Sequence, residues 1–118
     1  MSPDTLPPKP GPALRPPPEC ADSDVKCVVA RVFLDSEFAY LWEQGWVQAV
    51  VYCESRWDPW AQNTYHRGLF QISVSWLDGT WADLDAKYGD WWDPEANSRM
   101  AIHILGVQGR GAWICSPW

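Results

Sequence analysis

The sequence lacks both long hydrophobic runs and clusters of positive charge. It has no stretch of about 18 consecutive apolar residues, which is the length that a transmembrane helix needs. Fifteen acidic residues outnumber nine Lys and Arg residues, and the net charge is −6. A nucleic-acid binder needs a clustered basic face to neutralise phosphates, and none is present in the sequence. We therefore expect neither membrane insertion nor a nucleic-acid partner.

Signals for metal binding and export are also missing. There is no CxxC pair, and His66 and His103 are the two histidines, so the cysteines do not form a zinc-site pattern. We expect no metal and no cofactor. Residues 1–18 contain no apolar stretch that could form the core of a signal peptide, so export by the usual route is not expected.

Four cysteines are present, and an even number in a short chain favours disulfides in an oxidising setting. The spacing favours a bond between Cys20 and Cys27, which leaves Cys53 to pair with Cys115. The second bond would hold the C-terminus beside Glu54 and would contribute roughly 4 kcal/mol by closing a long loop. Disulfides without a signal peptide are compatible with a phage protein released by lysis or carried on a virion, or with a mature fragment without its leader.

Eight of the 11 prolines lie in residues 1–18, which predicts a disordered, extended arm of polyproline type. We assign residues 1–19 to this arm or linker and residues 20–118 to one domain. A hydrophobic content of 47% is sufficient for a single core. We expect a monomer that the arm can tether to a larger protein or a virion. A proline-rich ligand for another domain is the alternative interpretation of the arm.

Helical periodicity dominates the remaining sequence. It predicts a first helix after an N-cap at Asp22 or Ser23, and further helices over about 36–43, 46–56, 80–88 and 94–105. Residues 68–72 are short and apolar, and the pattern leaves them open between strand and helix. Sustained two-residue alternation is scarce. The expected class is therefore mainly α, with a small irregular or β region.

Glu54 has an unusual place on its predicted helix. At about 100° per residue it projects into an apolar arc. That arc comprises Trp46, Val47, Ala49, Val50, Val51, Cys53 and Trp57. A carboxylate there costs several kcal/mol unless it is paired, and Arg67 or Arg99 would be its partner in a purely structural interpretation. Apolar neighbours and the C-terminal end of a helix both favour the protonated acid, which can protonate a glycosidic oxygen.

Two segments resemble the signature of a known superfamily. The first comprises Cys53-Glu54-Ser55-Arg56-Trp57-Asp58-Pro59, then Ala61, Asn63 and Gly68-Leu69-Phe70-Gln71-Ile72. It is similar to the ES...P.A.N...GLFQI signature of soluble lytic transglycosylases, goose-type lysozymes and resuscitation-promoting factors. The second comprises Asp93-Pro94-Glu95-Ala96-Asn97, Ala101 and Trp113-Ile114-Cys115. It resembles the D-P-x-x-N...A...W-x-C ending of actinobacterial and phage members.

The resemblance implies a lysozyme-like helical domain that cleaves the β-1,4 bond between N-acetylmuramic acid and N-acetylglucosamine, with Glu54 as general acid. Its partner would be the glycan strands of peptidoglycan, met outside the cell, in the cell wall, or by a phage virion or lysis product. The resemblance assigns substrate binding to Ser55, Trp57, Asn63, Gly68, Leu69, Phe70 and Gln71. The ten tryptophans exceed what such a core needs, and we expect about half to face a ligand.

Several alternatives remain open at this level. The Ala-Tyr-Asn motif of the transglycosylases has no clear counterpart, so hydrolysis and anhydro-forming transglycosylation are both possible. The candidates for a second carboxylate are Asp58, Asp78, Asp83 and Asp85. The alternative function is a catalytically inactive module that binds peptidoglycan or serves as a structural component of a virion.

Overall fold

Helices form most of the protein, and a two-stranded sheet completes it. The computed structural model describes residues 19–118. The elements are α1 (Val25–Leu34), α2 (Ala39–Glu43), α3 (Trp46–Ser55), β1 (His66–Arg67), β2 (Ile72–Ser73), α4 (Val74–Leu77), α5 (Leu84–Tyr88), α6 (Pro94–Gln108) and a final 3-10 turn (Arg110–Ala112). The predicted mainly α class with a small β region is confirmed. The predicted arm lies, apart from residue 19, outside the described residues.

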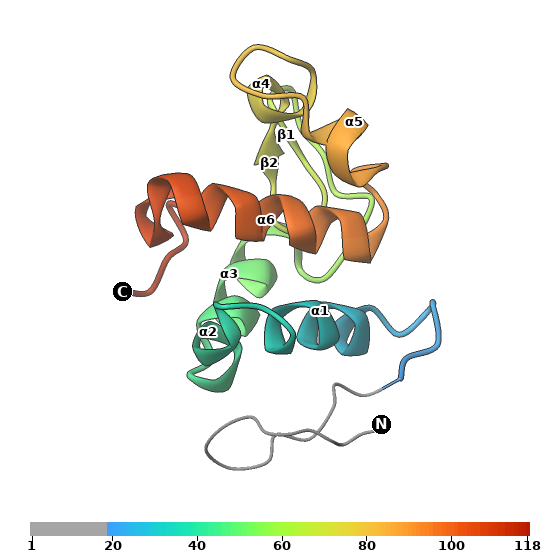
Figure 1. The fold of residues 1–118 in the computed structure, drawn as a ribbon, viewed down its shortest axis with the longest axis vertical. Coiled ribbons are helices and arrows are strands. Elements are labelled where there is room, and N and C mark those ends of the chain that lie inside the picture. The colour runs from blue at the N-terminus through green and yellow to red at the C-terminus, as the bar shows by residue number, and fades with distance from the viewer. Residues whose placement is uncertain (1–18) are drawn as a thin grey trace.

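The longest helix, α6, runs across the middle of the molecule (Figure 1). Helices α1, α2 and α3 lie on one side of it, and the sheet, α4 and α5 lie on the other. A salt bridge of 2.9 Å between Arg31 and Glu95 joins α1 to the first turn of α6. Strands β1 and β2 pair antiparallel, with Arg67 opposite Ile72. Helix α6 therefore connects the part of the fold that carries Glu54 to the part that carries the sheet.

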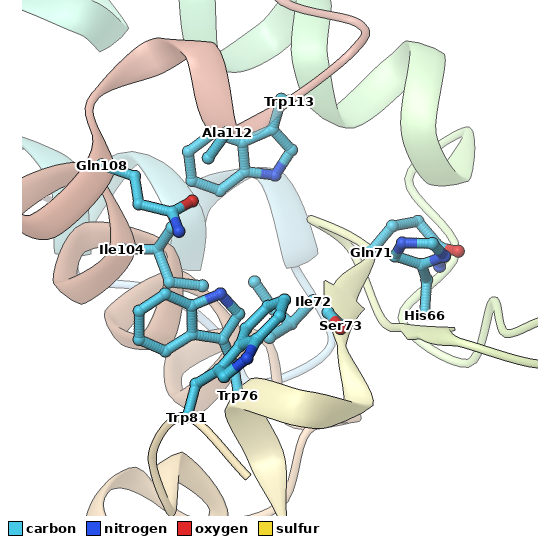
Figure 2. Close-up of a pocket in the computed structure, with 10 residues that line it drawn as sticks. All are labelled: His66, Gln71, Ile72, Ser73, Trp76, Trp81, Ile104, Gln108, Ala112 and Trp113. Atoms are coloured by element: carbon cyan, nitrogen blue, oxygen red, sulfur yellow. The ribbon is translucent and has the colours of Figure 1, made fainter.

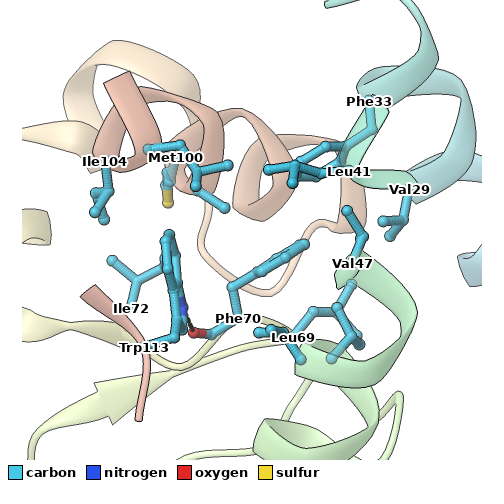
Figure 3. Packing of buried hydrophobic residues seen from close by; sticks show 14 of the residues in the cluster. Val29, Phe33, Leu41, Val47, Leu69, Phe70, Ile72, Met100, Ile104 and Trp113 are labelled. Atoms are coloured by element: carbon cyan, nitrogen blue, oxygen red, sulfur yellow. Dashed lines mark hydrogen bonds between the residues drawn. The ribbon is translucent and has the colours of Figure 1, made fainter. Parts of the chain in front are cut away.

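The core is centred on Phe70, which lies among apolar side chains from both sides of α6 (Figure 3). Its ring stacks on Phe33 of α1 at a centroid distance of 5.6 Å and meets the edge of Trp113 at 6.3 Å. Val47 of α3 and Met100 of α6 are also fully buried. Burial at about 25 cal/mol per Å² of apolar surface makes this cluster the main source of stability.

Helix α3 ends one residue earlier than predicted, and not because of Pro59. Arg56 and Trp57 have φ angles of 55° and 65°, so the backbone turns left-handed and leaves the helix before the proline. The predicted arc was also wrong in part, because Ala49 and Cys53 are exposed whereas Ser55 is buried. Ser55 tolerates burial since its hydroxyl donates to the Val51 carbonyl oxygen at 3.1 Å.

Two predicted helix starts were wrong. Asp24, not Asp22 or Ser23, caps α1 and accepts a hydrogen bond from the Cys27 backbone N–H. Asp83 is itself the N-cap of α5, so the helix starts at Leu84 and the expected capping box from residue 80 does not form. In each case a carboxylate that bonds to the N–H three residues ahead decides the start.

Other boundaries agree better with the sequence. Asp93 caps α6, with proline in its first turn as predicted, and the helix continues to Gln108, beyond the expected end at about 105. The second helix starts at Ala39, later than expected. In the open segment 68–72, residues 68–71 form a turn and Ile72 is the first residue of β2.

Both disulfide pairings are confirmed. Cys20 bonds to Cys27, and Cys53 bonds to Cys115 across a separation of 62 residues. No helix among residues 19–118 has both the length and the apolar character needed to cross a membrane. Two disulfides are typical of an oxidising, extracellular setting.

Candidate active site

Glu54 lies in the last turn of α3 and borders a pocket of about 360 Å³ that is open to solvent. The pocket is lined by Glu54, Asn63, His66, Gln71, Ala112, Trp113, Ile114 and Cys115. These residues come from the end of α3, from the loop around the sheet and from the C-terminal segment. Three parts of the chain that are distant in sequence therefore meet at one carboxyl group.

Burial raises the pKa of Glu54 above its ordinary value, and a hydrogen bond from the Cys115 backbone N–H lowers it by a smaller amount. Within residues 19–118, the salt bridges join Glu95 to Arg31 and to Arg99, and none involves Glu54. Arg67 instead donates to the carbonyl oxygens of Asn63 and His66. Neither arginine considered as a structural partner neutralises Glu54, and burial is the larger of the two effects on its pKa.

A second pocket, of about 250 Å³, is lined by the residues shown in Figure 2. Both are lined by His66, Gln71, Ala112 and Trp113, so together they form one groove, which we call the Glu54 groove. Its far end is bordered by Trp76 and Trp81. The two indole rings meet edge to face at 5.7 Å, and Trp81 is 61% exposed. The groove thus has a carboxyl group at one end and an exposed aromatic ring at the other.

Asn63 and Gln71, two of the predicted binding residues, lie in the groove with Glu54. Their side-chain amides also hold the loop together. Asn63 Oδ1 accepts hydrogen bonds from the backbone N–H groups of Tyr65 and His66 at 2.9 and 3.0 Å. Gln71 Nε2 donates to the carbonyl oxygens of residues 61 and 68 at 3.0 and 2.9 Å. The groove side is thus preorganised by the residues that border it.

No protein-family model, curated protein or solved structure matches this chain. The chemistry of the Glu54 groove therefore has to be inferred from its own residues.

Gly68, Leu69 and Phe70 were predicted to bind substrate, but they do not line the groove. The side chains of Leu69 and Phe70 are fully buried in the core. Gly68 has a φ of +81°, and a Cβ atom there would lie 2.3 Å from Asn97 Nδ2. The turn formed by Gly68, Leu69 and Phe70 precedes Gln71 and holds it in place. With its side chains buried, only the backbone of this turn could contact a ligand.

Ser55 and Trp57 also lie away from the groove lining. The Ser55 hydroxyl donates to the Val51 carbonyl oxygen within α3. The left-handed turn at Arg56 and Trp57 directs the Trp57 ring toward α1, where Lys26 Nζ lies 5.3 Å from its centroid. Ser55 and Trp57 were expected to border the same groove as Glu54. Because α3 ends at Ser55, the side chains that follow point away from the groove.

Sequence reasoning missed His66, Trp76, Trp81 and Ile114 as groove residues. The surplus of tryptophan was a signal for the aromatic rings, but it did not say which ones face the groove. The predicted bond between Cys53 and Cys115 was a stronger signal, because it already required the C-terminal segment to lie beside Glu54.

None of the four aspartates considered as a second carboxylate lines the groove. Asp58 accepts from the Trp60 backbone N–H, and Asp83 caps α5. Asp85 lies on α5, where burial and then the nearby Asp90 raise its pKa. Glu54 is the one carboxyl group among the described lining residues. Among residues 19–118, no cluster of three or more His, Cys, Asp or Glu residues could hold a metal ion.

Proposed function

We propose that this protein cleaves the β-1,4 bond between N-acetylmuramic acid and N-acetylglucosamine in peptidoglycan, with Glu54 as the general acid. One observation carries the proposal: burial raises the pKa of Glu54 at the border of a solvent-open groove. A half-buried carboxyl group without a cationic partner among the described residues costs stability, and such groups cluster at functional sites. The signature around Glu54 supports the same substrate.

In the first step, protonated Glu54 donates its proton to the glycosidic oxygen. The bond between the anomeric carbon and that oxygen breaks, and the leaving sugar departs as an alcohol. The remaining sugar acquires oxocarbenium character. The Glu54 carboxylate that results accepts a hydrogen bond from the Cys115 backbone N–H, which stabilises its new charge.

The second step does not need a second protein carboxylate. The oxygen of the substrate's own N-acetyl group can attack the anomeric carbon, as in substrate-assisted glycosidases. This route fits a groove in which Glu54 is the one described carboxyl group. Ionised Glu54 then removes a proton from the nucleophile, whose oxygen bonds to the anomeric carbon as the bond to the N-acetyl oxygen breaks. Water as nucleophile completes hydrolysis, and the sugar's own 6-hydroxyl gives an anhydro product.

We also propose that the helical domain is of the lysozyme type and works in the cell wall or as part of a phage virion or lysis system. The support is the resemblance of the two signature segments, which meet in the fold. Asn97 of the second segment accepts a hydrogen bond from the Phe70 N–H of the first at 2.9 Å. The two disulfides support action outside the cell.

Digestion of purified peptidoglycan, followed by mass spectrometry of the released muropeptides, tests the proposal. Anhydro ends would identify a transglycosylase, and reducing ends would identify a lysozyme. Glu54→Gln should abolish release while circular dichroism shows an intact fold. Undiminished release by this variant would exclude Glu54 as the general acid.

A binding module without catalysis is the second candidate. A cluster of Trp60, Trp91 and Trp92 outside the groove favours it, because the rings of Trp60 and Trp92 stack at 5.1 Å and Trp60 is 58% exposed. Such a surface can bind sugar rings without any acid. Saturable binding of glycan strands with no released products would support this candidate.

A further inference from the structure

We infer that the Cys53–Cys115 disulfide is a positioning element of the candidate active site, which holds the Cys115 backbone N–H as a hydrogen-bond donor to the Glu54 carboxylate. The inference rests on the proposed function of Glu54 and adds a positioning contact to that site. Titration of the hydrogen bond tests the contact independently of catalysis.

The C-terminal segment forms one side of the pocket beside Glu54. Four of the eight lining residues belong to it, namely Ala112, Trp113, Ile114 and Cys115. Cys53 precedes Glu54 in the last turn of α3 and bonds to Cys115 across 62 residues of sequence. A covalent link thus starts one residue before the proposed acid and ends at the residue whose N–H faces it.

Two hydrogen bonds hold other residues of the C-terminal segment in place. Trp113 Nε1 donates to the Phe70 carbonyl oxygen at 2.8 Å, and Trp46 Nε1 donates to Ser116 Oγ at 2.9 Å. Between these anchors, the side chain of Ile114 is fully exposed. The disulfide is the covalent link between Cys115 itself and the last turn of α3.

The Cys115 N–H stabilises Glu54 as a carboxylate but not as a neutral acid. This contact lowers the pKa of Glu54, whereas burial raises it. The two effects act in opposite directions on the same proton: burial favours keeping it, and the N–H contact favours its release. Loss of the N–H contact should raise the pKa of Glu54 further and slow proton donation.

Nuclear magnetic resonance of the isotope-labelled native chain tests the hydrogen bond. The Cys115 amide signal should shift with pH at the same midpoint as the Glu54 side-chain carboxyl signal. In Glu54→Gln, this transition should vanish. A Cys115 amide that does not respond while Glu54 titrates would overturn the inference, whether or not the protein cleaves peptidoglycan.

Removal of the disulfide tests the positioning role. In Cys53→Ser/Cys115→Ser, the Glu54 titration midpoint should move to higher pH, and cleavage at saturating substrate should slow by roughly ten- to a hundredfold. The matched control, Cys20→Ser/Cys27→Ser, removes the other disulfide and should leave the midpoint unchanged. Ser116→Ala keeps the disulfide but loses the hydrogen bond from Trp46 Nε1, and it should also leave the Glu54 titration midpoint unchanged.

Two outcomes would contradict the positioning role. A folded Cys53→Ser/Cys115→Ser protein with an unmoved midpoint would show that the N–H stays in place without the bond. Unfolding of this variant, with the control pair still folded by circular dichroism, would assign the disulfide to the fold instead of to the site.

Discussion

Asn97 Oδ1 accepts a hydrogen bond of 2.9 Å from the Phe70 backbone N–H in the middle of the core. Asn97 Nδ2 donates to the carbonyl oxygens of Trp91 and Arg67 at 3.0 and 3.3 Å. One fully buried amide of α6 thus binds three backbone groups in two other segments, residues 67–70 and the loop before α6. The turn that precedes Gln71 depends on this amide. Because Gln71 borders the Glu54 groove, one side of the groove depends on it as well.

Replacement of Asn97 should destabilise the whole domain. Asn97→Ala removes the partner of one buried and two partly buried backbone groups, and we expect a loss of roughly 2–4 kcal/mol in the free energy of unfolding. Urea denaturation measures it. The control Arg99→Ala removes an exposed ion pair with Glu95 on the same helix and should cost less than about 1 kcal/mol. Equal losses in the two variants would contradict the role of Asn97.

Gly68 should not tolerate a side chain. In Gly68→Ala the new Cβ would lie 2.3 Å from Asn97 Nδ2 and 2.8 Å from the Trp91 carbonyl oxygen, and the backbone would keep a left-handed φ of +81°. We expect thermal unfolding to show a loss of at least about 2 kcal/mol. Gly106→Ala is the matched control, because that site is helical with open space around it, and it should gain roughly 0.5–1 kcal/mol.

Cleavage should require protonated Glu54. Because burial raises the pKa of Glu54, the rate at saturating substrate should be highest on the acid side and should fall as the pH rises through that pKa. A pH profile of muropeptide release measures this limb. A rate that rises through the same range would mean that Glu54 acts first as a base.

Stability should depend on the same proton. The folded state holds it more tightly than the unfolded chain, whose Glu pKa is close to 4.5, so stability is lost as the pH rises through the folded pKa. Glu54→Gln cannot ionise, and it should therefore be more stable than the wild type at neutral pH. The difference in melting temperature should disappear in acid. A constant difference across the range would argue against a raised pKa.

Trp81 should contribute to binding and little to stability. Trp81→Ala should weaken the binding of a glycan oligosaccharide roughly two- to tenfold, measured by calorimetry. Trp60→Ala is closely matched, since Trp60 is 58% exposed and meets Trp91 edge to face at 5.8 Å, but it lies outside the groove. Equal effects of the two changes would place the sugar elsewhere.

Local features of the fold were readable from the sequence because they act over a few residues. The start of α6 depends on Asp93 and the proline after it, and both disulfide pairs follow from spacing. The start of α5 was misjudged because two capping groups, Thr80 and Asp83, competed within one turn. The end of α3 depends on φ angles at Arg56 that no residue type there requires.

The sequence by itself determined the helical class, the cysteine pairs and the identity of Glu54 as a carboxyl group in an apolar stretch. Only the tertiary structure decided what surrounds that carboxyl group. Burial raises its pKa, and the N–H that opposes this rise belongs to Cys115, which is bonded to Cys53 across 62 positions of sequence. Tertiary packing likewise turned Trp57 toward α1 and brought Trp81 to the groove. Periodicity describes the faces of one helix, whereas a groove depends on which faces of several segments meet.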